Sequence, residues 1–372
     1  MKREESKGMA LIEGSRLIME ALARAGADSY IGYPITPANL LYQYGGQRLD
    51  IMLAAPDEIS TLQWMSGLSS TGRIPVTATS FPGFALMIES INMAYMMELP
   101  MIIILVQRLG PSTGTATNGA QGDLLLLKGM ISGGHPIPVL CTSSFEDSWS
   151  LAAETVKMAV EMRTPVVLLT SKEEVMTHKS FDISKLDEIE KVDHKFYDNA
   201  EQYKSYLPKD MVPEFLPLTQ NRHQVRINAS THDQMGILQH STDEALTNTR
   251  RLEEKIYHRM KCHLKFDYDQ HENAEKIVLS YGITASAARE AVAQMRAEGE
   301  KVSLLIAKTL LPVPPVYLEI LKKYKRVVIA EENMNNQFGS LLFGINKPEG
   351  LRGAGALGKM ITPQQIIEEV KA

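Results

Sequence analysis

The stretch Gly32-Tyr33-Pro34-Ile35-Thr36-Pro37 decides how the first half of the chain is interpreted. The residues 30–32 are typical of a strand end. Thr36-Pro37 is typical of a helix start, with a hydroxyl side chain at the N-cap and proline at the first helical position. The hexapeptide therefore predicts a turn from a strand into a helix. Unpaired backbone N–H groups and the helix dipole at such a turn favour a bound carboxylate or phosphate, although an ordinary capped helix fits the same residues.

Strand-like and helix-like segments alternate on both sides of this turn. The run from Met101 to Val106 is continuously apolar, as expected for a strand that is buried on both faces. Segments with apolar residues at helical spacing separate the strand-like runs. The alternation predicts an α/β fold with a doubly wound parallel sheet and helices on both faces. The predicted strands are 30–32, 51–54, 74–79, 101–106, 137–141 and 165–170.

Four turns with unusual sequences follow the carboxyl ends of predicted strands. They are rich in polar residues, proline or glycine, and they comprise 33–37, 56–58, 80–83 and 108–117. In open α/β sheets the carboxyl edge is where ligands bind. Any one of these turns would be unremarkable alone, but four at the same edge predict a binding site there.

The character of the sequence changes after about residue 180. The segment 181–270 is rich in charged residues and carries several prolines, which indicates an irregular connecting arm with one helix at about 242–261. Strand-like runs then resume at 276–281, 302–306 and 326–330. The chain is therefore expected to comprise a first domain (1–180), a connecting arm (181–270) and a second, smaller α/β domain (271–372).

Composition narrows the class of protein. The 372 residues carry a net charge of −5, which gives no electrostatic case for nucleic-acid binding. Cys141 and Cys262 are too few for a four-cysteine zinc or iron–sulfur site in this chain, and they favour a reducing, cytoplasmic setting. The mixed charges of Met1–Glu5 do not resemble a signal peptide, and no apolar run is long enough for a membrane span. His258 and Cys262 share a predicted helix without a third ligand, so no metal site is predicted.

Two charged residues at the predicted edge are candidates for chemistry. Glu58 begins a helix among apolar neighbours. If it faces the sheet edge, burial would favour its protonated form, and otherwise it is a solvated glutamate that the helix dipole favours. Arg108 directly follows the buried strand, where its guanidinium would suit a planar carboxylate, or it is a surface arginine at a strand end.

The glycine-rich loop 110–122 matches no known nucleotide-binding spacing. It contains neither a Walker-type sequence nor a dinucleotide fingerprint. Ser112, Thr113 and Thr115 have no nearby histidine in the sequence that would activate them as nucleophiles. These observations weaken the nucleotide-hydrolase and serine-hydrolase interpretations.

The order and spacing of four motifs resemble the alpha subunits of the 2-oxoacid:ferredoxin oxidoreductases. The resemblance extends from about Gly14 to Thr170 and returns weakly in the last hundred residues. The chain departs from the family pattern at Phe81, where a small residue is frequent, and at 59–61, which is usually richer in alanine. These departures leave the exact substrate open. The motifs are Gly32 to Pro37, Asp57-Glu58-Ile59, Thr77 to Phe84, and Gln107-Arg108 with Gly110 to Gly114.

The resemblance implies a fold and a role for each motif. Residues 1–180 are expected to form the pyrimidine-binding domain of a thiamine diphosphate enzyme, and 271–372 to resemble a transketolase C-terminal-like domain used for assembly. Glu58 is expected to hydrogen-bond the aminopyrimidine ring nitrogen of the cofactor. The resemblance further places Tyr33, Pro34 and Ile35 against the cofactor, and Thr36 and Arg108 against the oxygens and the carboxylate of a 2-oxo acid.

The resemblance also implies an activity that needs partner subunits. The activity is thiamine diphosphate-dependent oxidative decarboxylation of a 2-oxo acid to its acyl-coenzyme A, with reduction of ferredoxin. The Gln-Arg-x-Gly-Pro-Ser-Thr-Gly loop favours 2-oxoglutarate, while branched-chain 2-oxo acids and pyruvate stay open. A non-catalytic assembly subunit of such a complex and a self-contained enzyme with another cofactor are the alternatives.

The missing motifs imply which parts the partners supply. The chain has no Gly-Asp-Gly sequence followed by asparagine, so the Mg²⁺ and diphosphate site is expected on a beta subunit. Iron–sulfur clusters are expected on other subunits. Gamma and possibly delta subunits, coenzyme A and ferredoxin complete the expected set of partners.

Overall fold

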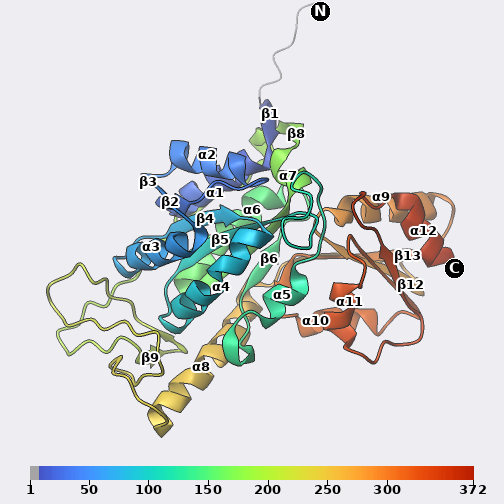
Figure 1. Ribbon diagram of the computed structural model, residues 1–372. Coiled ribbons are helices and arrows are strands. Elements are labelled where there is room, and N and C mark those ends of the chain that lie inside the picture. Colours follow the sequence, from blue (N-terminus) through green and yellow to red (C-terminus); the bar gives the residue numbers. More distant parts are fainter. Residues whose placement is uncertain (1–7) are drawn as a thin grey trace, which may run out of the picture.

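Two sheets organise the chain in the computed structural model, which describes residues 8–372. Met1–Glu5, whose charges bear on targeting, lie outside the described residues. A seven-stranded sheet is built mainly from the first half of the chain, and a five-stranded sheet from the last third. Figure 1 shows them side by side, the first in blue to green and the second in orange to red. The predicted α/β class with parallel sheets is confirmed.

The seven-stranded sheet has the order β14-β6-β7-β5-β4-β2-β3. Neighbouring strands run parallel except at β14, which pairs antiparallel with β6. Every residue of β5 and β7 is buried, as their continuous apolar sequences predict for central strands. The strands are β2 (Ser29–Gly32), β3 (Ile51–Ala54), β4 (Pro75–Thr79), β5 (Met101–Gln107), β6 (Val139–Cys141), β7 (Pro165–Ser171) and β14 (Thr309–Leu311).

Helices cover this sheet, and they pack in pairs. Helix α1 packs against α6 and against α2, and α3 packs against α4. Strand β1 (Met9–Glu13) pairs antiparallel with β8 (His178–Asp182) beside α1, an element that the sequence analysis did not predict. The helices are α1 (Gly14–Ala25), α2 (Asn39–Arg48), α3 (Glu58–Ser70), α4 (Phe81–Met96), α5 (Leu124–Gly129), α6 (Asp147–Met162) and α7 (Lys172–Met176).

The helix start predicted at Thr36-Pro37 is wrong. Helix α2 begins at Asn39, with Ala38 at the N-cap. The backbone N–H of Ala38 donates to the carbonyl of Ile35 (2.8 Å) and closes a turn around Thr36 and Pro37, which are joined by a cis peptide bond. This turn keeps Thr36 outside the helix, so its carbonyl oxygen is available to another partner.

The five-stranded sheet has the order β11-β13-β12-β15-β16, with β11 antiparallel to β13 and the other pairs parallel. Thr362 caps its last helix, because its hydroxyl accepts from the backbone N–H of Gln365 (3.4 Å) in a capping box. The strands are β11 (Phe266–Asp269), β12 (Lys276–Tyr281), β13 (Val302–Ala307), β15 (Arg326–Glu331) and β16 (Leu351–Gly355), and the helices are α9 (Thr284–Ala297), α10 (Pro315–Leu321), α11 (Gln337–Phe343) and α12 (Pro363–Lys371).

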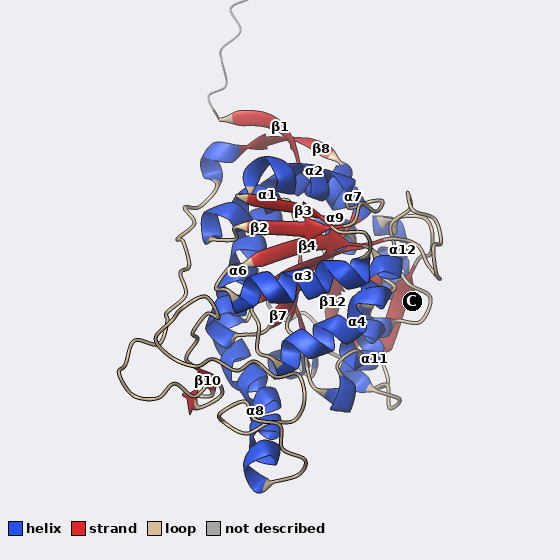
Figure 2. Cartoon of the chain, turned by 60° about the vertical axis from the view of Figure 1, so that its left-hand side comes forward, coloured by secondary structure: helices blue, strands red, loops and turns tan. Residues whose placement is uncertain are grey.

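Between the two sheets the backbone is mostly irregular. Residues 186–242 contain only the two-residue strands β9 (Pro208–Lys209) and β10 (Val212–Pro213), and the long helix α8 (Asp243–Arg259) follows. Figure 2 shows the irregular part as tan loops beside α8. This part of the chain is therefore mostly irregular up to residue 242, and one long helix follows it.

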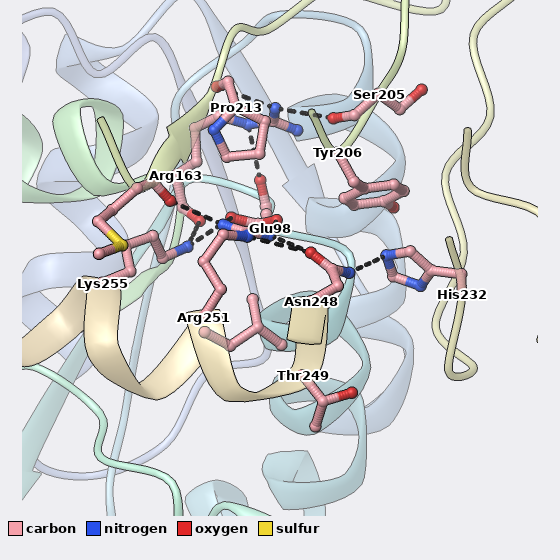
Figure 3. A network of polar contacts seen from close by, with 12 residues as sticks. Glu98, Arg163, Ser205, Tyr206, Pro213, His232, Asn248, Thr249, Arg251 and Lys255 are labelled. Atoms are coloured by element: carbon pink, nitrogen blue, oxygen red, sulfur yellow. Dashed lines mark hydrogen bonds and ion pairs between the residues drawn. The ribbon is translucent and has the colours of Figure 1, made fainter. Parts of the chain in front are cut away.

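A buried cluster of charges fastens α8 to the first sheet. Glu98, which follows α4, accepts hydrogen bonds from Lys255 Nζ (2.7 Å) and from the guanidinium of Arg251, and all three side chains are buried. Burial alone would raise the pKa of Glu98, but the charges of Lys255 and Arg251 outweigh it and hold the pKa well below its usual range. Arg163 extends the cluster by donating to the carbonyl of Pro213 in the arm (3.2 Å; Figure 3).

The helices of residues 8–372 include none that is both long enough and apolar enough to cross a membrane.

Candidate functional site

The candidate site lies where three adjacent strands end. Strands β2, β4 and β5 are neighbours in the first sheet and run in the same direction. Their carboxyl ends carry the segments 33–37 and 80–83 and the residue Arg108. Glu58 begins α3, directly after the N-cap Asp57, whose carboxylate accepts from the backbone N–H of Ser60 (2.7 Å). Three of the four predicted turns thus meet at one edge of the sheet, with the start of α3 beside them.

Glu58 is buried against the end of β4. Its side chain is 6 % exposed. Any side chain added at Gly83 would collide with Glu58 Oε1 and with Thr79 Oγ1, so the backbone at Gly83 leaves the room that the carboxyl group occupies. The expectation that Glu58 faces the sheet edge rather than solvent is therefore supported. Gly83 lies in the first turn of α4, where only glycine fits beside this carboxyl group.

Arg108 and Thr36 are in direct contact across the sheet edge. Arg108 is 6 % exposed, and its Nη1 donates to the carbonyl oxygen of Thr36, the group that the turn before α2 leaves free. Burial lowers the pKa of Arg108, and the nearby Asp123 carboxylate opposes that effect. The guanidinium is thus held at the end of β5 by a neutral carbonyl, which leaves its charge available to an anion.

The other predicted residues line the exposed side of this edge. Tyr33 is 41 % exposed, Pro34 is exposed, and Ile35 and Thr36 are half-buried. Within residues 8–372, no hydrogen bond joins Glu58 to any of them or to Arg108. The structure therefore brings Thr36 and Arg108 into contact, and it places Glu58 at the neighbouring strand end.

Several buried polar atoms at this edge have no hydrogen-bond partner in the described part of the chain. Buried polar groups in folded proteins are nearly always paired, so such atoms indicate that water, a bound molecule or another chain supplies the partners. They include Ser80 Oγ, Arg108 Nε and Asp123 Oδ2.

Asp123 is a member of this group that the sequence analysis missed. It occupies the N-cap of α5, yet its side chain makes no capping hydrogen bond among the described residues. It is buried, and burial raises the pKa of its carboxyl group to about 6, although the charge of Arg108 acts in the opposite direction. In the sequence an aspartate before Leu124 to Leu127 is an ordinary helix cap, so no signal distinguished it.

Glu174 is a second buried acid, at the start of α7 and the end of β7. Thr142, Thr170 and Glu174 form a ring of three contacts, with oxygen–oxygen distances of 2.9, 2.6 and 3.3 Å. The two threonine hydroxyls can both donate to the Glu174 carboxyl group, which Ser148 Oγ also approaches (3.4 Å). Burial outweighs these hydrogen bonds and raises the pKa of Glu174 to about 7.

Replacing Glu174 by glutamine is expected to change how stability depends on pH. The wild-type group gains its proton on folding, so its contribution is full below its unfolded pKa of 4.5 and is lost as pH rises through about 7. Glu174→Gln keeps the shape without the charge. We expect the variant to gain stability relative to wild type between pH 4.5 and 8, by about 3 kcal/mol at most. Urea unfolding at several pH values measures this, and parallel pH curves for the two proteins would contradict it.

Metal ligands do not gather in the part of the chain that the structure describes. No group of three or more histidine, cysteine, aspartate or glutamate side chains could hold a metal ion in residues 8–372. His258 and Cys262 accordingly have no third ligand of these types near them there.

Models of two protein families match the chain. Residues 20–253 match the family described as pyruvate flavodoxin/ferredoxin oxidoreductase, thiamine diphosphate-binding. Residues 274–347 match core domain II of pyruvate:ferredoxin oxidoreductase. The first match contains Glu58, Arg108 and the 33–37 turn, and the second contains β12, β13 and β15 of the five-stranded sheet.

Individual proteins agree with the family models. The subunit KorA of 2-oxoglutarate synthase from Methanocaldococcus jannaschii is 29% identical over 327 residues, which cover 87% of this chain and 88% of that protein. The subunit KorA of 2-oxoglutarate oxidoreductase from Mycobacterium tuberculosis is 30% identical over 350 residues, covering 92% of this chain and 53% of that protein.

A solved structure is similar over the whole chain. It is 2-oxoglutarate:ferredoxin oxidoreductase from Magnetococcus marinus with 2-oxoglutarate, coenzyme A and succinyl-CoA bound. The match has a TM-score of 0.90 and 25% identity, and it covers 100% of this chain and 66% of that one. Since the thiamine diphosphate-binding model alone covers more than half of the residues, the chain belongs to the pyruvate flavodoxin/ferredoxin oxidoreductase family.

Proposed function

We propose that this chain is the alpha subunit of a 2-oxoacid:ferredoxin oxidoreductase that converts 2-oxoglutarate to succinyl-CoA and reduces ferredoxin. The observation that carries the proposal is the buried guanidinium of Arg108, bound to the carbonyl of Thr36 at the strand end next to Glu58. One cationic fork and one buried carboxyl group at neighbouring strand ends suit a substrate with a carboxylate and a cofactor with a basic ring.

The residues at the edge fit thiamine diphosphate. The space beside Gly83 accommodates the Glu58 carboxyl group, which has no other hydrogen-bond partner among the described residues and is therefore free to hold a proton at a ring nitrogen of the cofactor. Tyr33, Pro34 and Ile35 form the adjoining exposed rim. When bound, thiamine diphosphate supplies the electron sink for cleavage of the bond between the carbonyl carbon and the carboxylate.

The remaining roles belong to residues of this chain. Arg108 binds the carboxylate of the 2-oxo acid through guanidinium N–H groups that do not bind the Thr36 carbonyl, and Thr36 orients the 2-oxo oxygen. Burial of Arg108 and of the Glu58 carboxyl group keeps water away from both, which strengthens their polar interactions with a ligand. These groups bind and orient; the electrons leave through other parts of the complex.

A beta subunit would complete the site by supplying Mg²⁺ and the diphosphate-binding residues. Exposed apolar side chains on the two helices of the site support such a partner. Ile59 and Trp64 are exposed on α3, which begins at Glu58, and Leu86 is exposed on α4, which contains Gly83. We further propose gamma and possibly delta subunits, iron–sulfur clusters on those partners, and a chain organised as 1–180, 181–270 and 271–372. The related enzyme with bound 2-oxoglutarate and coenzyme A supports the choice of substrates.

Coexpression tests this proposal. The chain is produced with the products of neighbouring genes, and the complex is assayed for coenzyme A-dependent reduction of a viologen dye with 2-oxoglutarate, pyruvate and branched-chain 2-oxo acids. We expect the highest kcat/KM with 2-oxoglutarate. A preference for another 2-oxo acid would correct the substrate alone, whereas inactivity with every 2-oxo acid would overturn the proposed function.

Substitution of Arg108 is expected to weaken substrate binding. Arg108→Ala removes the cation that faces the carboxylate, and a lost buried charge pair costs about 2 kcal/mol or more, which is roughly a thirtyfold rise in the KM for 2-oxoglutarate. Arg108→Lys keeps the charge but loses the fork, so a smaller rise is expected. The half-exposed Arg73, paired with Asp28, provides the matched control Arg73→Ala. Equal KM values in wild type and Arg108→Ala would contradict the role of Arg108.

A further inference from the structure

The loop 109–122 leaves the site at Arg108 and returns to it at Asp123. Its base is closed by backbone hydrogen bonds, from Leu109 N to Asn118 O (2.7 Å) and from Thr115 N to Leu109 O (2.9 Å). Its tip, from residue 110 to 115, is exposed. The residues 119–122, which lead from the tip back to Asp123, therefore decide where Asp123 lies relative to Arg108.

Gln121 binds this end of the loop, residues 119–122, to the second sheet. It is fully buried, and each of its polar groups is bound to a residue beyond position 280. Its Nε2 donates to Tyr281 O (2.8 Å), and its backbone N–H donates to Glu332 O (2.8 Å). Its Oε1 accepts from Thr284 Oγ1 (2.5 Å) and Glu332 N (2.7 Å), and its carbonyl accepts from Asn333 Nδ2 (3.0 Å). One glutamine thus makes five hydrogen bonds across a sequence distance of at least 160 residues.

The residues that bind Gln121 stand at the carboxyl edge of the second sheet. Tyr281 ends β12, and Glu331 ends β15. The Glu331 carboxylate accepts from Tyr281 Oη (3.1 Å), from Asn333 Nδ2 (2.6 Å) and from the backbone N–H of Phe338 (3.1 Å), so the partners of Gln121 are themselves held in place. Open α/β sheets bind ligands at this edge, and here the edge holds a side chain from the loop of the first sheet.

Further contacts fix the chain on both sides of Asp123. Gln337 Nε2 donates to the carbonyl of Gly122 (2.9 Å), and Gln337 Oε1 accepts from the backbone N–H of Leu125 (3.1 Å). Asp123 lies between these two anchored residues. In Figure 1, α5 and the loop before it lie between the first sheet and α11 of the second. The position of Asp123 therefore depends on contacts with the second sheet.

We propose that Gln121 is a positioning residue, through which the second sheet fixes the end of the 109–122 loop and, through the hydrogen-bonded base of that loop at Leu109, orients the adjacent Arg108 toward the carboxylate of the 2-oxo acid. This inference rests on the substrate-binding role proposed above for Arg108. It gives residues 271–372 a part in substrate recognition in addition to assembly.

Steady-state kinetics of the coexpressed complex test the proposal. We expect Gln121→Ala to raise the KM for 2-oxoglutarate about tenfold, with a smaller change in kcat and none in the KM for coenzyme A. Thr284→Val removes one hydrogen bond to Gln121 and keeps the side-chain shape, so a smaller change in the same direction is expected. Gln364→Ala, on the exposed face of α12, is the matched control. A residue that only stabilises the fold would lower Tm and leave both KM values unchanged.

A double-mutant cycle tests whether Gln121 affects the KM for 2-oxoglutarate through Arg108. If Gln121 acts through the guanidinium, Gln121→Ala should raise the KM little further in an Arg108→Ala background, because the aligned group is already absent. Additive effects in the two backgrounds would overturn the proposal.

Hydrogen exchange provides a readout that does not depend on activity. The backbone amides of residues 109–123 should exchange faster in Gln121→Ala than in wild type, and unchanged exchange would overturn the proposal. If the wild-type complex is inactive with every 2-oxo acid while these amides respond as expected, the proposed function fails and the anchoring role of Gln121 stands.

Discussion

Glu58→Ala should abolish nearly all turnover in the assembled complex, with a fall in kcat of about 10²- to 10⁴-fold, the range typical of a lost acid–base group. The reason is that the Glu58 carboxyl group is buried at the strand end, with Gly83 leaving room for it. Dye reduction with saturating 2-oxoglutarate and coenzyme A measures the effect.

Two further variants test whether the loss of kcat comes from the proton-exchanging carboxyl group of Glu58 itself. Glu58→Gln keeps the shape and can still donate a hydrogen bond, but it cannot exchange a proton, so we expect a loss close to that of the alanine variant. Glu89→Gln changes an exposed carboxylate on the neighbouring helix α4 and should leave kcat unchanged. If Glu58→Gln turned over substrate like wild type in an intact complex, the chain would be an assembly subunit rather than a contributor to catalysis.

The parts of the fold that follow from local sequence could be predicted. The buried strand β5 is a continuous apolar run, and α3 and α12 begin at Asp57 and Thr362, which cap them by side-chain hydrogen bonds. The placement of Glu58 and Arg108 at one edge followed because parallel strands end on the same side of a sheet. Each of these features is decided by residues within a few positions of one another.

The parts that depend on distant contacts could not be predicted. Strand β14 joins the first sheet from position 309, because it pairs with β6 some 170 residues earlier in the chain. Thr36 resembled a helix cap, but a turn closed by Ala38 and Ile35 places its carbonyl against Arg108 instead. Gln121 and Asp123 have no sequence signal at all, since their importance comes from partners beyond residue 280 and from burial beside Arg108.

Glu98→Ala is expected to cause the largest loss of stability of any single substitution considered for this chain. The change leaves Lys255 and the guanidinium of Arg251 buried without their counter-charge, and breaking a buried ion pair in this way costs about 3–5 kcal/mol. Because the pKa of Glu98 lies below its usual range, its contribution is present above the unfolded pKa of 4.5 and is lost as pH falls through the folded value. Urea unfolding at pH 7 measures the loss.

A surface cluster that also joins one glutamate to two cations tests whether burial or charge causes the loss of stability. Glu20 on α1 pairs with Arg24 (2.7 Å) and Arg48 (2.5 Å), so it also binds two cations, but these side chains are partly exposed. Glu20→Ala should therefore cost no more than about 1 kcal/mol. Since Arg163 joins the Glu98 cluster to the arm, Glu98→Ala should also speed proteolysis within residues 186–242 while Glu20→Ala does not. Equal losses in the two variants would mean that the buried cluster does not hold the arm against the first sheet.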